Sequence, residues 1–393
     1  MNPKAAVCPA WLATLLKQAG APVPFRQFMD WVLHHPAHGY YGAGQVQIGP
    51  TGDFATSPSL GPDFAALLAQ QLVDLLRCFP DDGEPISLVE CGPGSGDLAA
   101  DLQLALVQLA PDLVARCELV LVERSPALRD RQKQRLNQVK GLPLRWCSLD
   151  DLVVSPVRGV VLAHELLDAF PVDRLVVHNG CFELQGVTLD SAGQLCWCRL
   201  PLPDDLAESI RGLCAAEGQG FQLPPNGVPD GWATEWHSDV PAWFSALSCS
   251  ITAGALLVID YAMEASRYYA SRRSDGTLMT YRNGVAGLDP LASPGHQDLT
   301  AHLCIDTLNQ AAAAHGWRPL EQRRQGEALL ALGLAKRLHG LQSLPAGELS
   351  VALQRREALL RLVDPAALGE FRWLLYGRGT ATEPFRLSAG PGS

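Results

Sequence analysis

Short apolar runs alternate with amphipathic stretches between residues 85 and 262, and this pattern limits the possible fold more than any other feature. The runs are rich in Val, Leu and Ile and are almost uninterrupted by polar residues, which is typical of parallel strands buried on both faces. They read ISLVE, ELVLVE, PLRW, GVVLAH and GALLVIDY. Because amphipathic stretches connect them, the pattern predicts a sheet built from βαβ units.

The rest of the chain predicts additions at both ends of this core. We expect an N-terminal helical segment with a long Gly/Pro-rich loop over residues 1–80, a core over 81–262 and a C-terminal part over 263–393. The weaker pattern at about 173–250 predicts an insertion that begins with a hairpin, placed before the fifth strand. Helical patterns occur at residues 24–34, 63–78, 97–109, 300–318 and 329–362, and late strands are expected at 319–324 and 371–377, as an antiparallel pair at one sheet edge.

Composition excludes several classes of function. The chain has 393 residues, 47% of them hydrophobic, and a formal net charge of -10 without a basic run, so nucleic acid is not an expected partner. No apolar run approaches the roughly 20 residues that span a bilayer, and we read no signal peptide. Eleven cysteines, an odd number without a CxxC pair, indicate a reducing compartment. We therefore expect a soluble cytoplasmic protein.

A glycine-rich loop follows the first apolar run of the core, in the sequence SLVECGPGSGDL. Gly92, Gly94 and Gly96 allow a tight turn and close approach of a ligand, and the following helix offers free backbone amides to an anionic group. The next strand ends at Glu123, whose carboxylate can accept hydrogen bonds from both hydroxyls of a ribose. The loop and this carboxylate together predict a nucleoside site, although a turn that binds nothing is the alternative.

The glycine spacing indicates which nucleoside is bound. A dinucleotide fingerprint reads GxGxxG, whereas GPGSG is one residue shorter, which favours S-adenosylmethionine (SAM). Glu90, at the end of the preceding strand, suits the methionyl amino group. Ser148, the first residue of the stretch 148–151 after the third strand, is placed at the adenine edge. The fold class expected is therefore α/β, a Rossmann-like class I SAM-methyltransferase sheet with N-terminal and C-terminal helical additions.

A second group of polar residues follows the fourth strand, in GVVLAHELLDAFP. His164, Glu165 and Asp168 come directly after the buried run, on the ligand side of an open α/β sheet. If a helical turn begins here, Glu165 and Asp168 share one face; a helix cap is the alternative. HELLD lacks the second histidine of the zinc motif HExxH, so no metal is expected. Asp260 and Tyr261, at the end of the fifth strand, either line the same cleft or make structural hydrogen bonds.

Nearly the whole chain resembles the MidA-like (DUF185) family of class I SAM-dependent methyltransferases, which is related to the mitochondrial complex I assembly factor that methylates a protein arginine. The matching stretches include FRQFMDWVLHHPAHGYY, IGPTGDFATSP, VECGPGSGDL, LVERSPALRDRQ, AHELLDAFPV, VIDYA, GTLMTYR, PGHQDLTAHL and LGEFRWLLYG. GDFATSP and HELLDAFPV are the most specific of these. The chain departs from the family at His164, where the family usually has Asn, at Ser59, where it usually has Glu, and at Tyr281–Gly284, where a histidine is common.

The resemblance implies an enzyme that methylates arginine in a protein partner. A guanidinium stays protonated in water, so two carboxylates that grip it and take up its proton would serve the reaction, and Glu165 and Asp168 are the candidates, with His164 beside them. The resemblance also implies that Asp53, Thr56 and Ser57 fold over SAM as a lid.

Two other functions stay open. One is methyl transfer to a small molecule, and the other is a SAM-binding assembly factor with weak or lost transfer. The sequence does not specify the acceptor, the degree of methylation or the oligomeric state.

Overall fold

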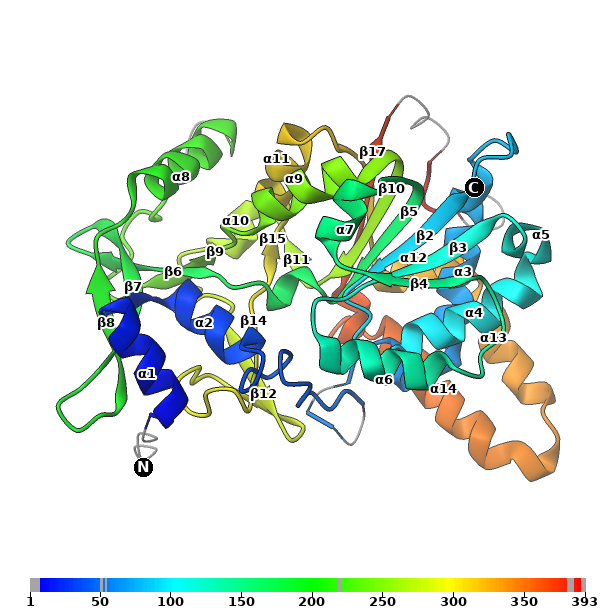
Figure 1. The fold of residues 1–393 in the computed structure, drawn as a ribbon, viewed down its shortest axis with the longest axis horizontal. Helices are drawn as coiled ribbons and strands as arrows, with labels where there is room; N and C mark the ends of the chain where they lie inside the picture. Colours follow the sequence, from blue (N-terminus) through cyan, green and yellow to red (C-terminus); the bar gives the residue numbers. More distant parts are fainter. Residues whose placement is uncertain (1–7, 50–51, 54, 218–220, 380–384, 390–393) are drawn as a thin grey trace. The chain divides into compact units, whose positions relative to one another are not determined.

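The computed structural model describes residues 8–49, 52–53, 55–217, 221–379 and 385–389 (Figure 1). Contacts divide the chain into two compact units. Unit 1 comprises residues 1–47, 168–242 and 262–311, and unit 2 comprises residues 48–167, 243–261 and 312–393. This division differs from the three consecutive segments expected above, because the chain passes back and forth between the units.

Unit 2 contains a seven-stranded, mostly parallel sheet. In the order β16-β17-β10-β5-β2-β3-β4, only β17 runs antiparallel to its neighbours. The five apolar runs form β2, β3, β4, β5 and β10, and the late strands form the antiparallel edge pair, as predicted. The strands are β2 (Ile86–Cys91), β3 (Cys117–Val122), β4 (Leu144–Cys147), β5 (Val157–His164), β10 (Ile251–Asp260), β16 (Arg318–Arg324) and β17 (Arg372–Arg378).

The order of the strands reverses beside β2. The chain proceeds from β2 to β3 and β4 on one side and then returns to β5 on the other, and β2 pairs in parallel with both β3 and β5. In open α/β sheets a ligand binds outside the carboxyl ends of the strands at such a switch point. The ends of β2 and β5, at Cys91 and His164, are therefore the expected ligand-binding edge.

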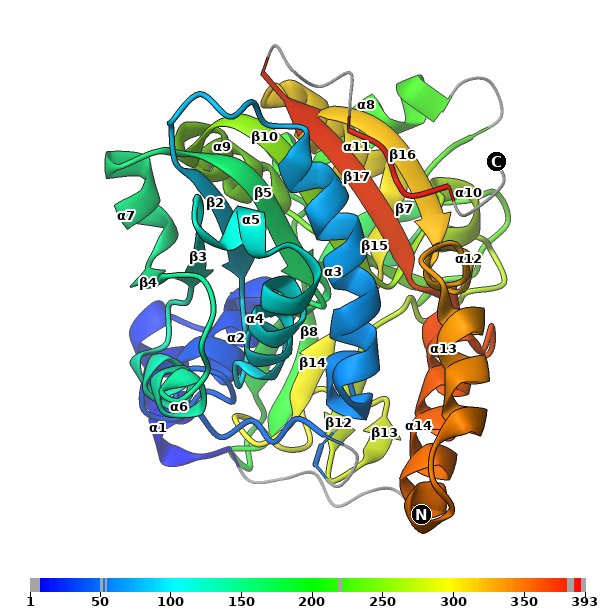
Figure 2. The same cartoon turned by 90° about the vertical axis from the view of Figure 1, so that its right-hand side faces the viewer.

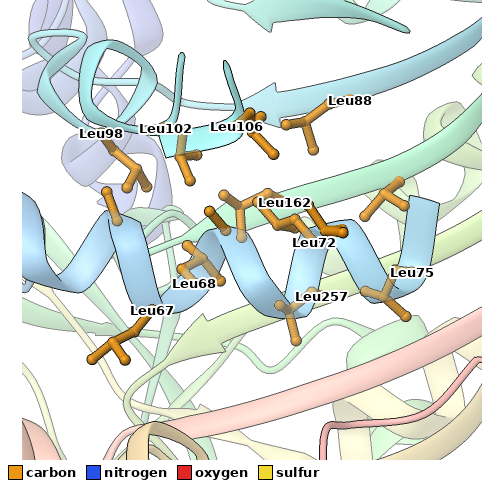
Figure 3. Packing of buried hydrophobic residues seen from close by; sticks show 14 of the residues in the cluster. Leu67, Leu68, Leu72, Leu75, Leu88, Leu98, Leu102, Leu106, Leu162 and Leu257 are labelled. Atoms are coloured by element: carbon orange, nitrogen blue, oxygen red, sulfur yellow. The ribbon is translucent and has the colours of Figure 1, made fainter. Parts of the chain in front are cut away.

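Helices cover the sheet of unit 2. Figure 2 shows α3 crossing the sheet with α4 beside it, and Figure 3 shows leucines of both helices packed on Leu88, Leu162 and Leu257 of three adjacent strands. On the opposite face Phe244 of α9 packs on Tyr376 of β17. The helices are α3 (Pro62–Arg77), α4 (Asp97–Leu109), α5 (Pro111–Val114), α6 (Pro126–Leu136), α7 (Leu149–Val154) and α9 (Val240–Ser250), the last beginning in unit 1.

The prediction of one continuous helix over residues 329–362 is wrong. The structure has three helices instead, α12 (Gln325–Ala331), α13 (Leu334–Gly340) and α14 (Leu349–Val363). Gly333 adopts a left-handed conformation with φ of 94° between the first two, and Pro345 lies in the turns before the third. Glycine and proline both interrupt helical hydrogen bonding, which amphipathic periodicity alone does not reveal.

Unit 1 contains the insertion and the remaining short sheets. β6 and β7 form the expected hairpin within a five-stranded sheet with β1, β8 and β9. The helix expected at 300–318 is shorter, because β14 and β15 precede it. The elements are α1 (Ala10–Ala19), β1 (Val23–Pro24), α2 (Phe25–His34), β6 (Asp173–His178), β7 (Cys181–Leu189), β8 (Leu195–Leu200), α8 (Asp204–Glu217), β9 (Ala233–Trp236), β11 (Ala262–Met263), α10 (Ala265–Tyr268), β12 (Met279–Arg282), β13 (Val285–Gly287), β14 (Asp298–Thr300), β15 (Leu303–Cys304) and α11 (Ile305–Ala314), whose last turn falls in unit 2.

Among the residues that the structure describes, no helix combines the length and the apolar character needed to cross a membrane.

Candidate functional site

The glycine loop joins β2 to the N-terminus of α4 in unit 2, as the sequence predicted. Gly92, Gly94 and Gly96 all have left-handed backbone conformations, with φ of 69°, 54° and 87°. A Cβ on Gly92 would lie 2.6 Å from Leu166 Cδ1, so a side chain here would require the end of the Leu166 side chain to shift. The loop is a tight turn at the switch point, and it brings the backbone next to the segment that follows β5.

Glu90 is a buried carboxyl group at the end of β2. Its side chain is almost fully enclosed, and Oε2 has no hydrogen-bond partner among the described residues. Burial raises the pKa of Glu90 to about 8. The protein thus holds an uncharged carboxyl group next to the glycine loop, and a cationic ligand group would both supply the missing partner and favour ionisation.

Glu123 follows β3, and its carboxylate is held by two donors. The Ser125 backbone amide donates to Oε1 over 2.7 Å, and Gln132 Nε2 donates to Oε2 over 3.2 Å. Burial raises the pKa of Glu123, while these donors oppose that shift. The Arg124 backbone amide also acts on this carboxylate. A carboxylate has about four acceptor positions, so the group can still accept a hydrogen bond from a ligand.

Sequence analysis missed Gln132. It lies on the mostly polar helix α6, where Leu128 and Leu136, four residues before and after it, are buried on the same face as the fully buried Gln132 side chain. In the sequence, Gln132 is the last residue of LVERSPALRDRQ, one of the stretches that resemble the family. Gln132 contacts Glu123 and the glycine loop.

His164 and Glu165 lie at the carboxyl end of β5. Burial lowers the pKa of His164 to about 3, so the ring is neutral at physiological pH. Its Nε2 lies 3.5 Å from Glu165 Oε1 and makes no hydrogen bond within the described part of the chain, so this contact is not an ion pair. Glu165 has φ of 46°, a backbone conformation that side-chain-bearing residues rarely adopt, and its amide donates to Ile259 O over 2.9 Å.

The segment expected to act as a lid is connected to Glu165. The Ser57 backbone amide donates to Glu165 Oε1 over 3.3 Å, and Gln325 Nε2 donates to Ser57 Oγ over 3.2 Å. Ser59 Oγ closes a turn with the backbone of Thr56, accepting from its amide and donating to its carbonyl. Asp53, Thr56 and Ser57 are all buried, and Phe54, within the same motif, lies outside the described residues. The segment therefore helps to position Glu165.

Asp168 begins the second stretch of unit 1. The prediction of a helical turn that begins at Glu165 is wrong. The structure has a 3₁₀ turn over Leu167–Ala169, and Glu165 precedes it. The two carboxylates therefore do not share a helix face. Within unit 1, burial and the carboxylates of Asp298 and Asp168 raise the pKa of Tyr41, whose hydroxyl donates to Asp298 Oδ1 over 2.8 Å.

Two other candidates have structural partners. Ser148 caps α7 through a capping box in which its Oγ accepts from the Asp151 amide over 3.1 Å and the Asp151 carboxylate accepts from the Ser148 amide. Asp260 accepts hydrogen bonds from the amides of Leu167 and Tyr261, which supports the structural alternative left open for this residue. An adenine contact at Ser148 stays a prediction.

Comparison with known proteins assigns the chain to a family. A model of the family described as "Putative S-adenosyl-L-methionine-dependent methyltransferase" matches residues 67–322. The chain belongs to this family. Its fold and its cofactor, SAM, are thereby confirmed as the sequence predicted.

Individual relatives agree with this assignment. The "Protein arginine methyltransferase NDUFAF7 homolog, mitochondrial" of Drosophila melanogaster is 27% identical, with 90% of this chain and 81% of that protein aligned. The mouse protein named "Protein arginine methyltransferase NDUFAF7, mitochondrial" is 28% identical, with 90% and 80% aligned. A solved structure from Burkholderia thailandensis, bound to S-adenosyl-homocysteine, has a TM-score of 0.82 and 29% identity and covers 96% of this chain and 94% of its own.

Proposed function

We propose that this SAM-dependent methyltransferase transfers the methyl group to an arginine side chain of a protein. The observation that carries the proposal is the position of Glu165. It directly follows β5 at the switch point, and its neighbour Leu166 lies against the glycine loop at Gly92. The relatives named protein arginine methyltransferases support the choice of acceptor.

The residues of unit 2 fit SAM. We propose that Glu123 accepts hydrogen bonds from the ribose hydroxyls and that the unpartnered Oε2 of Glu90 faces the methionyl ammonium group. The loop of Gly92, Gly94 and Gly96 lets the backbone approach the cofactor. Ser148 is proposed at the adenine edge, and Asp53, Thr56 and Ser57 complete the proposed site. When bound, SAM supplies an electrophilic methyl group on a positively charged sulfur.

The chain's own residues have to orient and deprotonate the acceptor. We propose that Glu165 accepts a hydrogen bond from the guanidinium and takes up the proton that the attacking nitrogen loses as its bond to the methyl carbon forms and the carbon–sulfur bond breaks. The hydrogen bond from the Ser57 amide to Oε1 helps to orient this carboxylate toward the substrate. Asp168 belongs to unit 1, and its role as a second carboxylate for the guanidinium stays a prediction from the sequence. His164 is neutral, so it adds no positive charge that would repel the substrate.

A labelling experiment tests the proposed function. The purified protein is incubated with methyl-labelled SAM and a cell lysate, and the label is followed into protein and small-molecule fractions. Label in protein that is recovered as methylarginine after acid hydrolysis supports the proposal. Label only in small molecules indicates a different acceptor class, and tight SAM binding without transfer indicates the assembly-factor alternative.

A further inference from the structure

Gln132 uses both donor positions and one acceptor position of its side-chain amide. Nε2 donates to Gly94 O over 2.9 Å and to Glu123 Oε2 over 3.2 Å, while Oε1 accepts from Trp146 Nε1 over 3.2 Å. The indole N–H of Trp146 can only donate, so it determines which end of the amide faces it. Both donors of Gln132 are consequently directed at Gly94 and Glu123.

The packing around Gln132 leaves little freedom for this amide. Its side chain is fully buried, and a Cβ on Gly96 would lie 3.3 Å from Gln132 Cγ and 3.4 Å from its Cα. The third glycine of the loop is therefore packed directly on Gln132. One side chain thus contacts both halves of the nucleoside site, the glycine loop after β2 and the carboxylate after β3.

We propose that Gln132 is a positioning residue of the SAM site, which holds the Glu123 carboxylate in the orientation that receives the ribose hydroxyls and fixes the glycine loop relative to it. The inference rests on the assignment of Glu123 to the ribose in the proposed function. The donors Ser125 N on Oε1 and Gln132 Nε2 on Oε2 restrict the directions in which the Glu123 carboxylate can accept hydrogen bonds from a ligand. Preorganised groups bind more tightly because less freedom is lost on binding.

A structural role alone would have a different consequence from a positioning role. If Gln132 only stabilises the fold, its loss weakens binding of every ligand of the site by the same factor. If it orients Glu123, its loss specifically removes the contribution of the ribose hydroxyls. The ratio of affinities for S-adenosylhomocysteine and its 2′-deoxyribose analogue therefore separates the two roles.

The experiment measures both ligands by calorimetry on the full chain and on four variants. Gln132→Met keeps the length of the side chain but removes both donors, and Gln132→Glu keeps the shape and adds a charge facing Glu123. Gln134→Met is the matched control, because Gln134 is exposed on the same helix. Glu123→Ala is the reference for a lost ribose contact. Thermal unfolding and circular dichroism establish that each variant is folded.

We expect the wild-type protein to prefer the ribose ligand by about 10-fold or more, the scale of one lost charge-assisted hydrogen bond. Gln132→Met should weaken S-adenosylhomocysteine binding by about 10-fold and reduce the ribose preference to below about 3-fold, while Gln134→Met changes neither. Gln132→Glu should weaken binding further through repulsion between the two carboxylates. If Gln132→Met does not fold, Gln132→Glu serves as the test variant, and a reduced preference for the ribose ligand in that variant supports the proposal.

An unchanged ribose preference in a folded Gln132 variant, with a lost preference in Glu123→Ala, overturns the inference and leaves the ribose assignment intact. An unchanged preference in Glu123→Ala overturns the ribose assignment, and the positioning role of Gln132 with it. The two failures are therefore distinguishable.

Discussion

The backbone amide of Ser57 donates a hydrogen bond to Glu165 Oε1 over 3.3 Å, although 108 residues separate the two positions. Gln325 Nε2 in turn donates to Ser57 Oγ and to the carbonyls of Leu362 and Leu368. Ser57 thus links the Glu165 carboxylate to Gln325, which is bonded in turn to a third segment of unit 2. Such a buried polar network fixes the orientation of its members, as expected for a group that must meet a substrate in one geometry.

Glu165→Gln should lower methyl transfer to arginine by roughly 100-fold, the scale of losing a positioned base. Gln can still accept the hydrogen bond from the Ser57 amide, so the segment should stay in place, and affinity for S-adenosylhomocysteine should change by less than about 2-fold. Single-turnover rates and calorimetry measure the two quantities. Asp168→Asn is expected to give the same separation, and Glu84→Gln, an exposed carboxylate of unit 2, should change neither quantity.

Two results would contradict this assignment. Loss of cofactor affinity in Glu165→Gln would place the carboxylate in the SAM site instead of the acceptor site. Full transfer activity in both Glu165→Gln and Asp168→Asn would leave these residues with a structural role only.

Glu90 predicts that cofactor affinity depends on pH. The pKa of the buried carboxyl group is about 8 in the free protein against an ordinary value of 4.5, so the group is protonated at pH 6. A ligand whose ammonium group needs the ionised form must displace this proton, and affinity should rise by up to about 10-fold per pH unit until pH 8. Calorimetry with S-adenosylhomocysteine from pH 6 to 8 measures this rise. Glu90→Gln should bind more weakly at pH 8 and lose the dependence, and an unaltered pH profile in this variant would refute the role.

The buried neutral ring of His164 should cause a second pH effect, on the free energy of unfolding. Its pKa falls from 6.5 to about 3 in the folded protein, so below pH 6.5 the unfolded state binds a proton that the folded state excludes. Stability therefore falls with decreasing pH, and this residue accounts for about 2 kcal/mol between pH 7 and 5. His164→Asn should remove that part of the loss in urea unfolding, whereas His339→Asn, at an exposed position, should not. If the stability of His164→Asn falls with decreasing pH as much as that of the wild-type protein, the neutral buried state of His164 is contradicted.

The same variant also tests the acceptor. Asn is the residue usual in the family at this position, so His164→Asn should retain or raise transfer to arginine. A collapse of activity would mean that this chain has a different substrate from its relatives.

The sequence predicted the elements of the sheet because each depends on a local pattern. The strands read as short, mostly apolar runs, and the glycine loop has a spacing visible within a few residues. The breaks around α13 and the short α11 were missed, since Gly333 and the strands before Ile305 interrupt patterns that remain amphipathic overall. Local patterns thus indicated which elements exist better than where the helices end.

Most of the contacts around the candidate site could not be predicted in this way. Gln132 is a polar residue on the face of α6 that also carries Leu128 and Leu136, and its contacts with Trp146 and the glycine loop come from other segments. The contact of Ser57 with Glu165 requires the fold to bring residues 57, 165 and 325 together. Hydrogen bonds between remote segments leave no periodicity in a sequence, so these partners became visible only in three dimensions.

Gly94→Val should abolish cofactor binding while leaving most of the fold intact. Gly94 has φ of 54°, and a Cβ there would lie 3.1 Å from Ile48 Cδ1, so a branched side chain both strains the turn and occupies space beside the loop. Its carbonyl also accepts the hydrogen bond from Gln132, so a shift of the turn would disturb the partner of Glu123. We expect affinity for S-adenosylhomocysteine to fall by more than about 100-fold, about 3 kcal/mol, by calorimetry.

The matched control for this variant is Gly83→Val. Gly83 also has a left-handed conformation, with φ of 81°, but nothing lies within 4 Å of an added Cβ, and the residue is exposed in the loop before β2. Both variants should lose about 1–3 kcal/mol of unfolding free energy through backbone strain, because a side chain at positive φ is unfavourable at either site. Only Gly94→Val should lose the cofactor. If a folded Gly94→Val protein binds S-adenosylhomocysteine as tightly as Gly83→Val, the loop is a structural turn and does not approach the ligand.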